Sequence, residues 1–298
     1  MQVSIIIINY NTKEITKTCI ESIFKNTKNI DFEIILVDNA SNDGSFDLFN
    51  NDSRITYIYN KENLGFGKAN NLGYERCKGR YILLLNSDTI LLNNAIKLFH
   101  DYMESNSNDV GCIGSILLDK ENNTGHSYGD FHSLSNTLYE WFIFPVLKKI
   151  KIVKSLSKYD NPQLYKKNEF EVPYIIGANL FIRKTIIEKY GLFDPDFFLY
   201  FEDTELQHRY AKNNIKRVII EGPQIIHLEG KSNTDSNSFK RREIQISSLI
   251  LYWKKTQKRY NYIFYKLTFL TLYLIRLLFE FNTKGSKYNH INFVLSLY

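Results

Sequence analysis

Five short segments of this 298-residue chain are its most informative feature, and four of them place polar residues just beyond an apolar strand or in a glycine-rich turn. They are VSIIIINYN near the N-terminus, VDNASNDGS from Val37, NLGFGKANN from Asn63, LLLNSD up to Asp88, and FFLYFEDTELQHR around Asp203. In an open α/β sheet, ligands bind outside the carboxyl ends of the strands. The placement of Asp, Asn and Gly at these points therefore predicts a site for one polar ligand.

The first two segments carry groups that could recognise a nucleobase. In Asn9-Tyr10-Asn11 the tyrosine face can stack on a base and an amide can hydrogen-bond it. The carboxylate of Asp38 can accept a hydrogen bond from a pyrimidine ring N–H. The alternatives are an ordinary strand-to-helix turn capped by Asn11, and a turn capped by Asp38, since Asn, Ser, Asp and Gly follow it.

The third and fourth segments suit a diphosphate and a metal ion. Gly65 and Gly67 allow close approach of the backbone to a ligand, and the N-terminus of a following helix attracts phosphate. Asp88 could bind Mg²⁺ or Mn²⁺ together with diphosphate oxygens and water. The alternative for Asp88 is a solvated strand end. A lone histidine such as His227 is more often structural than a ligand.

The fifth segment could supply a general base. Glu202 and Asp203 follow the aromatic run FFLYF, and a carboxylate beside an apolar wall has a raised pKa. The alternative is that these acids favour the first turn of a helix through its dipole. Both can hold, and Glu202 is the second choice for the base. Downstream, Lys231, Arg241 and Arg242 could neutralise a leaving diphosphate or form a solvated face.

The elements that must position these residues alternate between strands and helices. Hydrophobic runs predict buried strands over Val3–Ile8, Phe32–Val37, Ile55–Tyr59 and Tyr81–Leu85, with a helix over Gly67–Cys77. Asn11 to Glu14 has the spacing of a capping box. This order predicts a parallel sheet. Further predicted elements are strands over Val110–Leu118, Tyr174–Arg183, Arg217–Ile220 and Gln224–His227, a helix over Thr204–Asn213, and a largely helical Ser238–Tyr298.

Composition fits a globular chain with one large domain and an appendage, since 44% of residues are apolar and 15% aromatic. The net charge of +6 is far from that of a nucleic-acid arm and suits an anionic small molecule or membrane face. Cys19, Cys77 and Cys112 have no metal-ligand spacing, which indicates a reduced cytosolic chain. No basic region precedes the first apolar run, so we expect a strand there and not a signal peptide.

Taken together and in order, the five segments resemble those of family 2 glycosyltransferases, and in particular of bacterial rhamnosyltransferase-like members. The resemblance covers roughly residues 3–232. It implies an α/β fold of the GT-A type, with a mostly parallel sheet, and inverting transfer from a nucleotide-sugar donor. It divides the chain into a catalytic domain, 1–233, and a C-terminal helical segment, 234–298. The sequence departs from the family's Asp-x-Asp metal motif, because Asn86 stands in its first position.

The resemblance also implies a role for each candidate residue. Asp203 is the expected base, supported by Glu202, and Asp88 and His227 are the expected ligands of Mg²⁺ or Mn²⁺. Gly177 and Ala178 are expected on the acceptor side. The expected donor-binding residues are Asn9, Tyr10, Asn11, Asp38, Asn63, Gly65, Gly67, Asn70, Asn86 and Ser87.

The implied donor is dTDP-rhamnose, with UDP-sugars next, and the acceptor is a glycan or a polyprenyl-diphosphate-linked sugar. The product would be a bacterial surface polysaccharide such as O-antigen or capsule. Two other readings are a sugar-phosphate nucleotidyltransferase and a non-catalytic scaffold of the same fold. The first loop, NYNTKE, lacks the glycine-rich phosphate loop of the nucleotidyltransferases, and the presence of Asp88 and Asp203 argues against a scaffold.

The segment Tyr262–Phe281 is strongly apolar, but Lys266, Arg276 and Glu280 interrupt it. A spanning helix needs about 20 apolar residues with few charges. We therefore expect an interfacial or partly buried helix on the cytoplasmic face of the plasma membrane. The aromatic and basic segment Trp141–Lys154 could make the same contact. The alternatives are that both segments are lids on the catalytic domain or form an oligomer interface.

Overall fold

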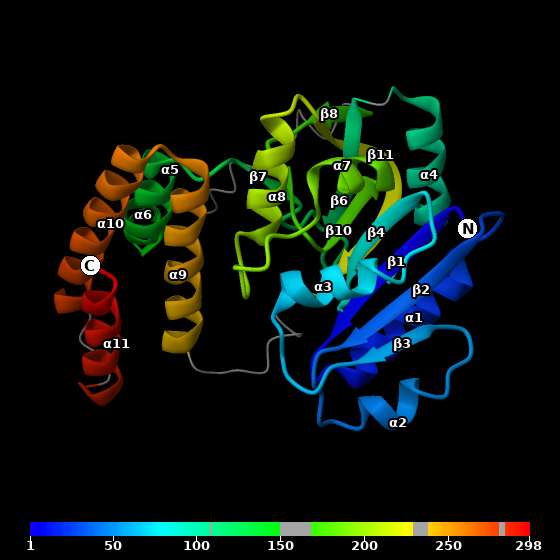
Figure 1. Ribbon diagram of the computed structural model, residues 1–298, viewed down its shortest axis with the longest axis horizontal. Coiled ribbons are helices and arrows are strands. Elements are labelled where there is room, and N and C mark those ends of the chain that lie inside the picture. The colour runs from blue at the N-terminus through cyan, green and yellow to red at the C-terminus, as the bar shows by residue number, and fades with distance from the viewer. Residues whose placement is uncertain (108, 150–167, 229–237, 280–283) are drawn as a thin grey trace.

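The computed structural model describes residues 1–107, 109–149, 168–228, 238–279 and 284–298 (Figure 1). Its strands are β1 (Val3–Asn9), β2 (Phe32–Asp38), β3 (Thr56–Tyr59), β4 (Tyr81–Asn86), β5 (Thr89–Leu91), β6 (Val110–Leu118), β7 (Tyr128–Gly129), β8 (Glu169–Glu171), β9 (Tyr174–Ile175), β10 (Asn179–Arg183) and β11 (Lys216–His227). Its α-helices are α1 (Lys13–Asn26), α2 (Ser45–Phe49), α3 (Phe66–Tyr74), α4 (Ala95–Ser105), α5 (Leu134–Leu138), α6 (Phe144–Lys149), α7 (Lys184–Tyr190), α8 (Glu202–Ala211), α9 (Ser238–Thr256), α10 (Arg259–Phe279) and α11 (Lys284–Ser296), and a π-helix, η1 (Tyr139–Ile143), joins α5 to α6.

A central sheet of nine strands has the order β3-β2-β1-β4-β10-β6-β11-β5, with β8 also paired to β11. Strands β3, β2, β1 and β4 are parallel. The register pairs Asn9 with Asp38 and Ile8 with Asn86, so three predicted site residues lie at one edge of the sheet. Strand β10 runs antiparallel between β4 and β6. The sheet is therefore mixed but largely parallel, as expected.

Helices cover both faces of this sheet because successive strand residues point to opposite sides. In β1, Ile5 and Ile7 pack with residues of α1 and α4 in one buried cluster. Ile6, between them, packs with residues of α3, α7 and α8 in another. The central strands β1, β2, β4 and β6 are largely buried on both faces, which explains why their sequences are continuous apolar runs.

Most predicted elements are confirmed, and β6 begins and ends where its apolar run does. The bounds of three predicted strands differ from those in the structure. The run Tyr174–Arg183 forms two strands, β9 and β10, because the chain leaves the ladder between them and the amide of Gly177 donates to the Asp203 carboxylate, 2.9 Å away. Conversely, Arg217–Ile220 and Gln224–His227 belong to one strand, β11, whose register shift at Ile220/Ile225 absorbs the residues between them.

The predicted cap at Asn11 is wrong. The N-cap of α1 is Thr12, which makes no side-chain cap hydrogen bond. Asn11 has a φ of 54° and accepts a hydrogen bond from the amide of Asn42. The first helical amide, that of Lys13, instead donates to the Asp43 carboxylate at 2.8 Å. A residue of the next loop therefore replaces the local cap.

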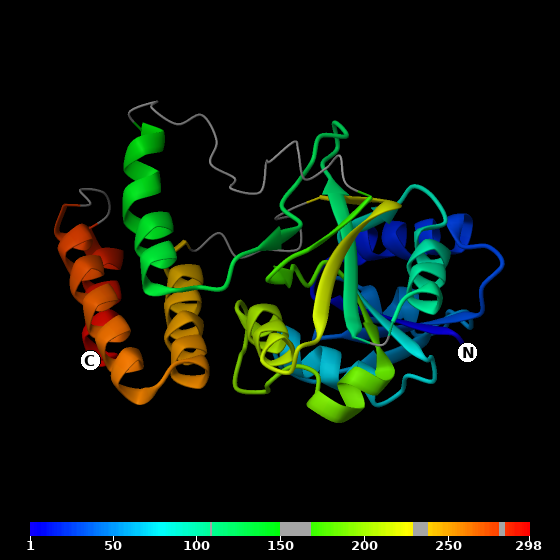
Figure 2. The same ribbon diagram turned by 90° about the horizontal axis from the view of Figure 1, so that it is seen from above.

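The C-terminal helices lie beside α5 and α6, at the end of the molecule away from β1–β3 (Figure 1). A third buried cluster joins α9, α10 and α11 through Trp253, Phe269 and Val294. Seen from above, α9 lies between α10 and the central sheet (Figure 2). The helical character predicted for this region is confirmed, whereas the predicted boundary between residues 233 and 234 lies outside the described residues, as do Lys231 and residues 150–154.

Candidate active site

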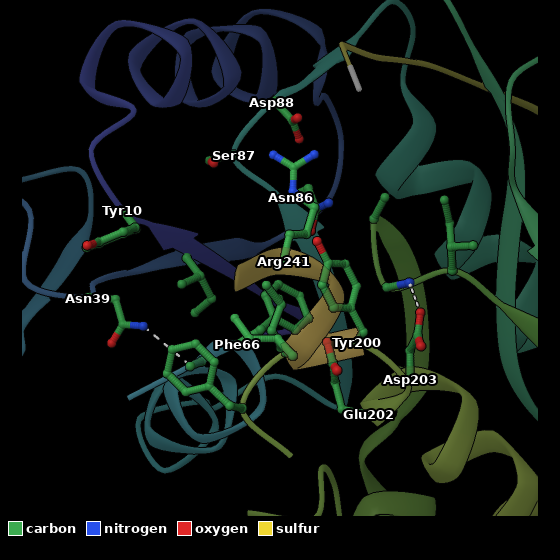
Figure 3. Close-up of a pocket in the computed structure, with 18 of the residues that line it drawn as sticks. Tyr10, Asn39, Phe66, Asn86, Ser87, Asp88, Tyr200, Glu202, Asp203 and Arg241 are labelled. Carbon is green, nitrogen blue, oxygen red and sulfur yellow. Dashed lines mark hydrogen bonds between the residues drawn. The ribbon is translucent and has the colours of Figure 1, made fainter. Parts of the chain in front are cut away.

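A cavity of about 390 Å³ opens beyond the carboxyl ends of β1 and β4 (Figure 3). It joins segments that are far apart in the sequence, from the first strand to α9. The sequence-predicted residues that line it are Tyr10, Asn63, Gly65, Asn86, Ser87, Asp88, Gly177, Ala178, Glu202, Asp203 and His227. The others, Asn9, Asn11, Asp38, Gly67 and Asn70, do not line it.

Asp38 lies behind the wall of the cavity and is completely buried. Its carboxylate accepts hydrogen bonds from the Asn9 amide (3.1 Å), the Tyr57 hydroxyl (2.8 Å) and the backbone N–H of Ser41 (2.8 Å). Burial and this carboxylate raise the pKa of Tyr57, so its hydroxyl remains a donor. The carboxylate therefore binds three protein donors that hold the loop after β2 to the end of β1.

Asn39, which the sequence analysis did not single out, does line the cavity. Its amide donates to Asn63 Oδ1 at 2.7 Å, and its own Oδ1 accepts from the amide of Asn60 and the backbone of Leu64, each at 3.0 Å. Asn63 in turn accepts from the backbone of Gly65. These bonds position the turn before α3, and Tyr10 lies on the same side of the cavity as Asn39 (Figure 3).

The glycines of this turn approach the protein's own backbone. Gly65 has a φ of +81°, and a Cβ built there would lie 2.2 Å from the carbonyl oxygen of Phe198. The first amide of α3, that of Phe66, donates to the same oxygen at 2.8 Å. Gly67 packs against Phe193. The turn therefore docks the loop before α8, and this helical amide is already engaged, contrary to the expectation that it is free for phosphate.

Asp88 and His227 come together at the other end of the cavity. Strands β5 and β11 pair Thr89 with His227, and this places His227 Nε2 3.3 Å from Asp88 Oδ1. Asn86 Nδ2 is 3.4 Å from the same ring nitrogen. Asp88 is almost completely buried, with 1% of its surface exposed. The order of strands in the sheet thus unites two residues 139 positions apart.

The chemistry of this pair fits a divalent cation. A carboxylate oxygen and an imidazole nitrogen 3.3 Å apart can bind one ion, and Mn²⁺ accepts both kinds of ligand. The described residues contain no group of three or more His, Cys, Asp or Glu that could hold a metal. The remaining ligands would therefore come from a bound substrate and from water.

Glu202 and Asp203 form the opposite wall, at the first turn of α8. Asp203 Oδ2 accepts from the backbone of Gly177 at 2.9 Å, and Oδ1 accepts from the backbone of Thr204 at 2.7 Å. Burial raises the pKa of Asp203, while these hydrogen bonds and the nearby His126 oppose the rise. Glu202 is also buried, and its Oε2 has no hydrogen-bond partner among the described residues.

The protonation of the two carboxyl groups is linked, since the charge of Asp203 disfavours a charge on Glu202. Burial, and then the charge of Asp203, raise the pKa of Glu202 to about 8. A negative charge is better stabilised on Asp203 than on Glu202, because three protein donor groups and the N-terminus of α8 interact with the Asp203 carboxylate. We assign the shared proton to Glu202 at neutral pH, which leaves Asp203 ionised and able to accept a proton.

Several lining residues have no signal in the sequence. His126 follows β6 in a loop, and Tyr200 has a φ of 69°, within the loop that turns α8 toward the cavity. Lys240, Arg241 and Ile244 come from the start of α9. Among these residues, the sequence singled out only Arg241, as part of a basic run. The others could not be predicted, because no local sequence pattern shows which helix lines the cavity.

The sequence model described as "Glycosyl transferase family 2" matches residues 4–191. The chain is similar to the glycosyltransferase GlyG of Streptococcus pneumoniae, with 33% identity over 113 residues, which cover 36% of this chain and 37% of GlyG. It is also similar to the UDP-Glc:alpha-D-GlcNAc-diphosphoundecaprenol beta-1,3-glucosyltransferase WfaP of Escherichia coli, with 40% identity over 106 residues, which cover 35% of this chain and 41% of WfaP. The matches thus span well under half of each relative.

Among solved structures, S. aureus TarS 1-349 in complex with UDP has the same fold. It aligns with a TM-score of 0.55 and 12% identity, covering 99% of this chain and 71% of TarS 1-349. This alignment extends past α8 into the C-terminal helices, beyond the residues that the family sequence model matches.

Proposed function

The chain belongs to glycosyl transferase family 2, and we propose that it is an inverting glycosyltransferase that moves a sugar from a nucleotide diphosphate to an acceptor hydroxyl. The observation that carries the proposal is the arrangement of one cavity. The partly buried carboxylate of Asp203 lies on one wall, and the Asp88–His227 pair lies at the other end.

In this proposal Asp203 takes the proton of the acceptor hydroxyl. The acceptor oxygen then forms a bond to the anomeric carbon while the bond from that carbon to the diphosphate oxygen breaks on the opposite face. One such displacement inverts the anomeric centre. Gly177 holds the Asp203 carboxylate toward the acceptor side, and Ala178 continues that wall. The protonated Glu202 limits the negative charge beside the base.

Asp88 and His227 would hold a divalent cation at the diphosphate end, where Asn86 and Ser87 complete the wall. The cation would neutralise charge on the leaving diphosphate, which is Lewis-acid chemistry. Tyr10 and Asn63 line the donor side, where Tyr10 would stack on the base. Because Asp38 has three protein donors, we propose that it acts on the base through the loop it holds, next to Asn39.

The donor is a UDP-sugar or dTDP-rhamnose, and the acceptor is a lipid-linked or growing surface polysaccharide. The names of the relatives support this class. WfaP is named for UDP-glucose as donor and for a diphosphoundecaprenol-linked GlcNAc as acceptor. That name favours a UDP-sugar over the rhamnose donor expected from the sequence.

A donor panel tests the proposal. The protein is incubated with UDP-glucose, UDP-GlcNAc, UDP-galactose and dTDP-rhamnose in Mn²⁺, with a bacterial membrane extract as the source of acceptor, and free nucleotides are measured by mass spectrometry. We expect release of UDP or dTDP that depends on the extract. Release of pyrophosphate from a nucleoside triphosphate and a sugar phosphate would indicate a nucleotidyltransferase. Absence of turnover together with absence of donor binding by calorimetry would indicate a scaffold.

Removal of divalent metal is expected to lower turnover about 100-fold, because the leaving diphosphate would lose its neutralising charge. EDTA should have this effect, and Mn²⁺ should reverse it. Asp88→Asn should weaken Mn²⁺-dependent binding of UDP in calorimetry, while the exposed Asp47→Asn should not. Undiminished turnover in EDTA would contradict the metal assignment.

We further propose that one face of α10 contacts an anionic membrane. Six large apolar side chains are exposed along it, namely Tyr260, Ile263, Phe264, Leu267, Leu272 and Ile275. The opposite face, with Phe269, Tyr273 and Leu277, is buried in the helical bundle. No helix in the described part of the chain is both long and apolar enough to span a bilayer.

Charges near this stripe suit an anionic surface. Lys254, Lys258 and Arg259 are exposed between the end of α9 and the start of α10. Lys255, by contrast, pairs with Asp194 and Asp196, each at 2.7 Å. Peripheral contact with the inner face of the plasma membrane would bring the enzyme to a polyprenyl-linked acceptor.

We expect the protein to sediment with phosphatidylglycerol vesicles and the double variant Phe264→Glu/Leu267→Glu to lose at least about tenfold in partitioning, since burial of each apolar side chain stabilises binding. Leu295→Glu, an exposed position on α11, serves as the control. Two results together would identify the stripe as a subunit interface instead. The wild type would not bind vesicles, and light scattering would show a dimer that dissociates when the double substitution is made.

A further inference from the structure

The first turns of α9 line the catalytic cavity although they lie beyond the residues matched by the family sequence model. Arg241 and Ile244, three positions apart, share the face of α9 that meets the cavity, together with Lys240. In Figure 3 the side chain of Arg241 extends toward Asn86 and Asp88, at the diphosphate end of the cavity. The adjacent Arg242 lines a different, smaller cavity with Trp141.

Specific contacts fix the position of α9 against the catalytic domain. The Ser248 hydroxyl donates to the carbonyl of Leu199 at 2.7 Å, in the loop that leads to Glu202. The Trp253 indole donates to the carbonyl of His132 at 2.9 Å. Lys255 pairs with Asp194 and Asp196. These three contacts fix the position and rotation of α9 against the catalytic domain. The packing of the helix therefore determines that Arg241 lines the cavity.

Both cationic and carboxylate side chains line the cavity. Asp203 and Glu202 lie on the α8 wall, and α9 contributes Arg241 and Lys240, of which Arg241 extends toward Asp88 (Figure 3). Arg241 is partly buried, so bulk solvent screens its charge less than that of an exposed side chain. A guanidinium presents two parallel N–H groups that match a phosphate. A cation of this kind near Asp88 suits an anionic group at that end.

We propose that Arg241 binds the diphosphate of the donor, so that the C-terminal helical segment completes the donor site. The inference rests on the proposed function, since it names a group that binds the donor at the same site. It also assigns separate roles within the basic run, because Arg242 lines the other cavity. In this arrangement the negative charge that develops on the leaving diphosphate is stabilised by Arg241 as well as at the Asp88–His227 pair.

Calorimetry with UDP, dTDP and the corresponding nucleosides tests the proposal on the full-length protein in Mn²⁺. We expect Arg241→Ala to weaken binding of the preferred nucleoside diphosphate about 10- to 100-fold, the effect of losing a hydrogen bond to a charged group. Binding of the nucleoside should change less than about twofold, because it has no phosphate. Arg241→Lys should lie between Arg241→Ala and the wild type. Lys254→Ala, the loss of an exposed cation from the same helix, should have no effect.

The same experiment separates the possible failures. Equal binding of the diphosphate by the wild type and by both Arg241 variants would overturn this inference and leave the proposed function standing. Parallel losses for nucleoside and diphosphate, with a lower melting temperature, would show that Arg241 only fastens α9 to the domain, which also overturns it. If the wild type binds no nucleotide diphosphate with any metal, the proposed function fails, and the inference fails with it.

Discussion

Replacement of Asp203 by Asn is expected to lower the turnover number about 10³-fold while the affinity for the nucleotide diphosphate stays within about twofold of the wild type. An amide keeps the shape of the side chain and can still accept the hydrogen bond from Gly177. It cannot take the proton of the acceptor hydroxyl. The measurement is steady-state release of the nucleotide diphosphate, together with calorimetric binding of UDP or dTDP to the same preparation.

Glu202→Gln is the matched control, one residue away on the same wall. Because burial raises the pKa of Glu202 to about 8, this group already carries a proton at neutral pH, and an amide resembles it in charge. We therefore expect the turnover of Glu202→Gln at pH 7 to stay within about tenfold of the wild type. If Glu202→Gln loses activity and Asp203→Asn keeps it, the base is Glu202 and our assignment of the shared proton is wrong.

Replacement of Gly65 by Ala is expected to lower the free energy of unfolding by about 3 kcal/mol or more and to abolish measurable donor binding. The backbone at Gly65 has a φ of +81° and a ψ of 173°, a region that is essentially restricted to glycine. The added Cβ would also lie 2.2 Å from the carbonyl oxygen of Phe198, so the loop before Glu202 must move. Urea unfolding and calorimetric binding of UDP measure the two effects.

Gly44→Ala separates backbone conformation from the clash. Gly44 also has a positive φ, +82°, but its nearest neighbour is the flexible end of Lys13, 3.4 Å from a built Cβ. Only the left-handed conformation then opposes the methyl group, at about 1–2 kcal/mol. A loss of stability at Gly65 no larger than that at Gly44 would mean that the contact with Phe198 yields easily and does not constrain the site.

Much of the fold could be predicted because the central strands of the sheet are largely buried on both faces. Such strands are continuous apolar runs, and β1, β2, β4 and β6 are visible as Val, Ile and Leu segments. The polar residues at their ends mark the edge of the sheet where a ligand binds. This logic placed Asp88 at the cavity without knowledge of the strand order, whereas Asp203, which follows no strand, was expected there from the resemblance to the family.

The roles within that edge could not be predicted, because they depend on partners far apart in the sequence. Asp38 and Asn39 are neighbours with the same turn chemistry, yet one is enclosed by Asn9, Tyr57 and Ser41 and the other lines the cavity. The glycines of the third segment allow a close approach, but only the packing shows that Phe198 is what approaches Gly65. The type of a residue limits the interactions it can make, whereas its packing in the folded protein determines which partners it contacts.

The sequence by itself determined the chemical groups available to this protein, namely the carboxylates of Asp88 and Asp203, the imidazole of His227 and the apolar strands of the sheet. The tertiary structure alone decided how these groups combine. The antiparallel pairing of β5 with β11 brings His227 to Asp88, and the docking of α9 brings Arg241 to the same cavity. The physical reason is that periodicity reports which face of an element is buried, whereas the partner on that face follows from the order of strands and helices in space.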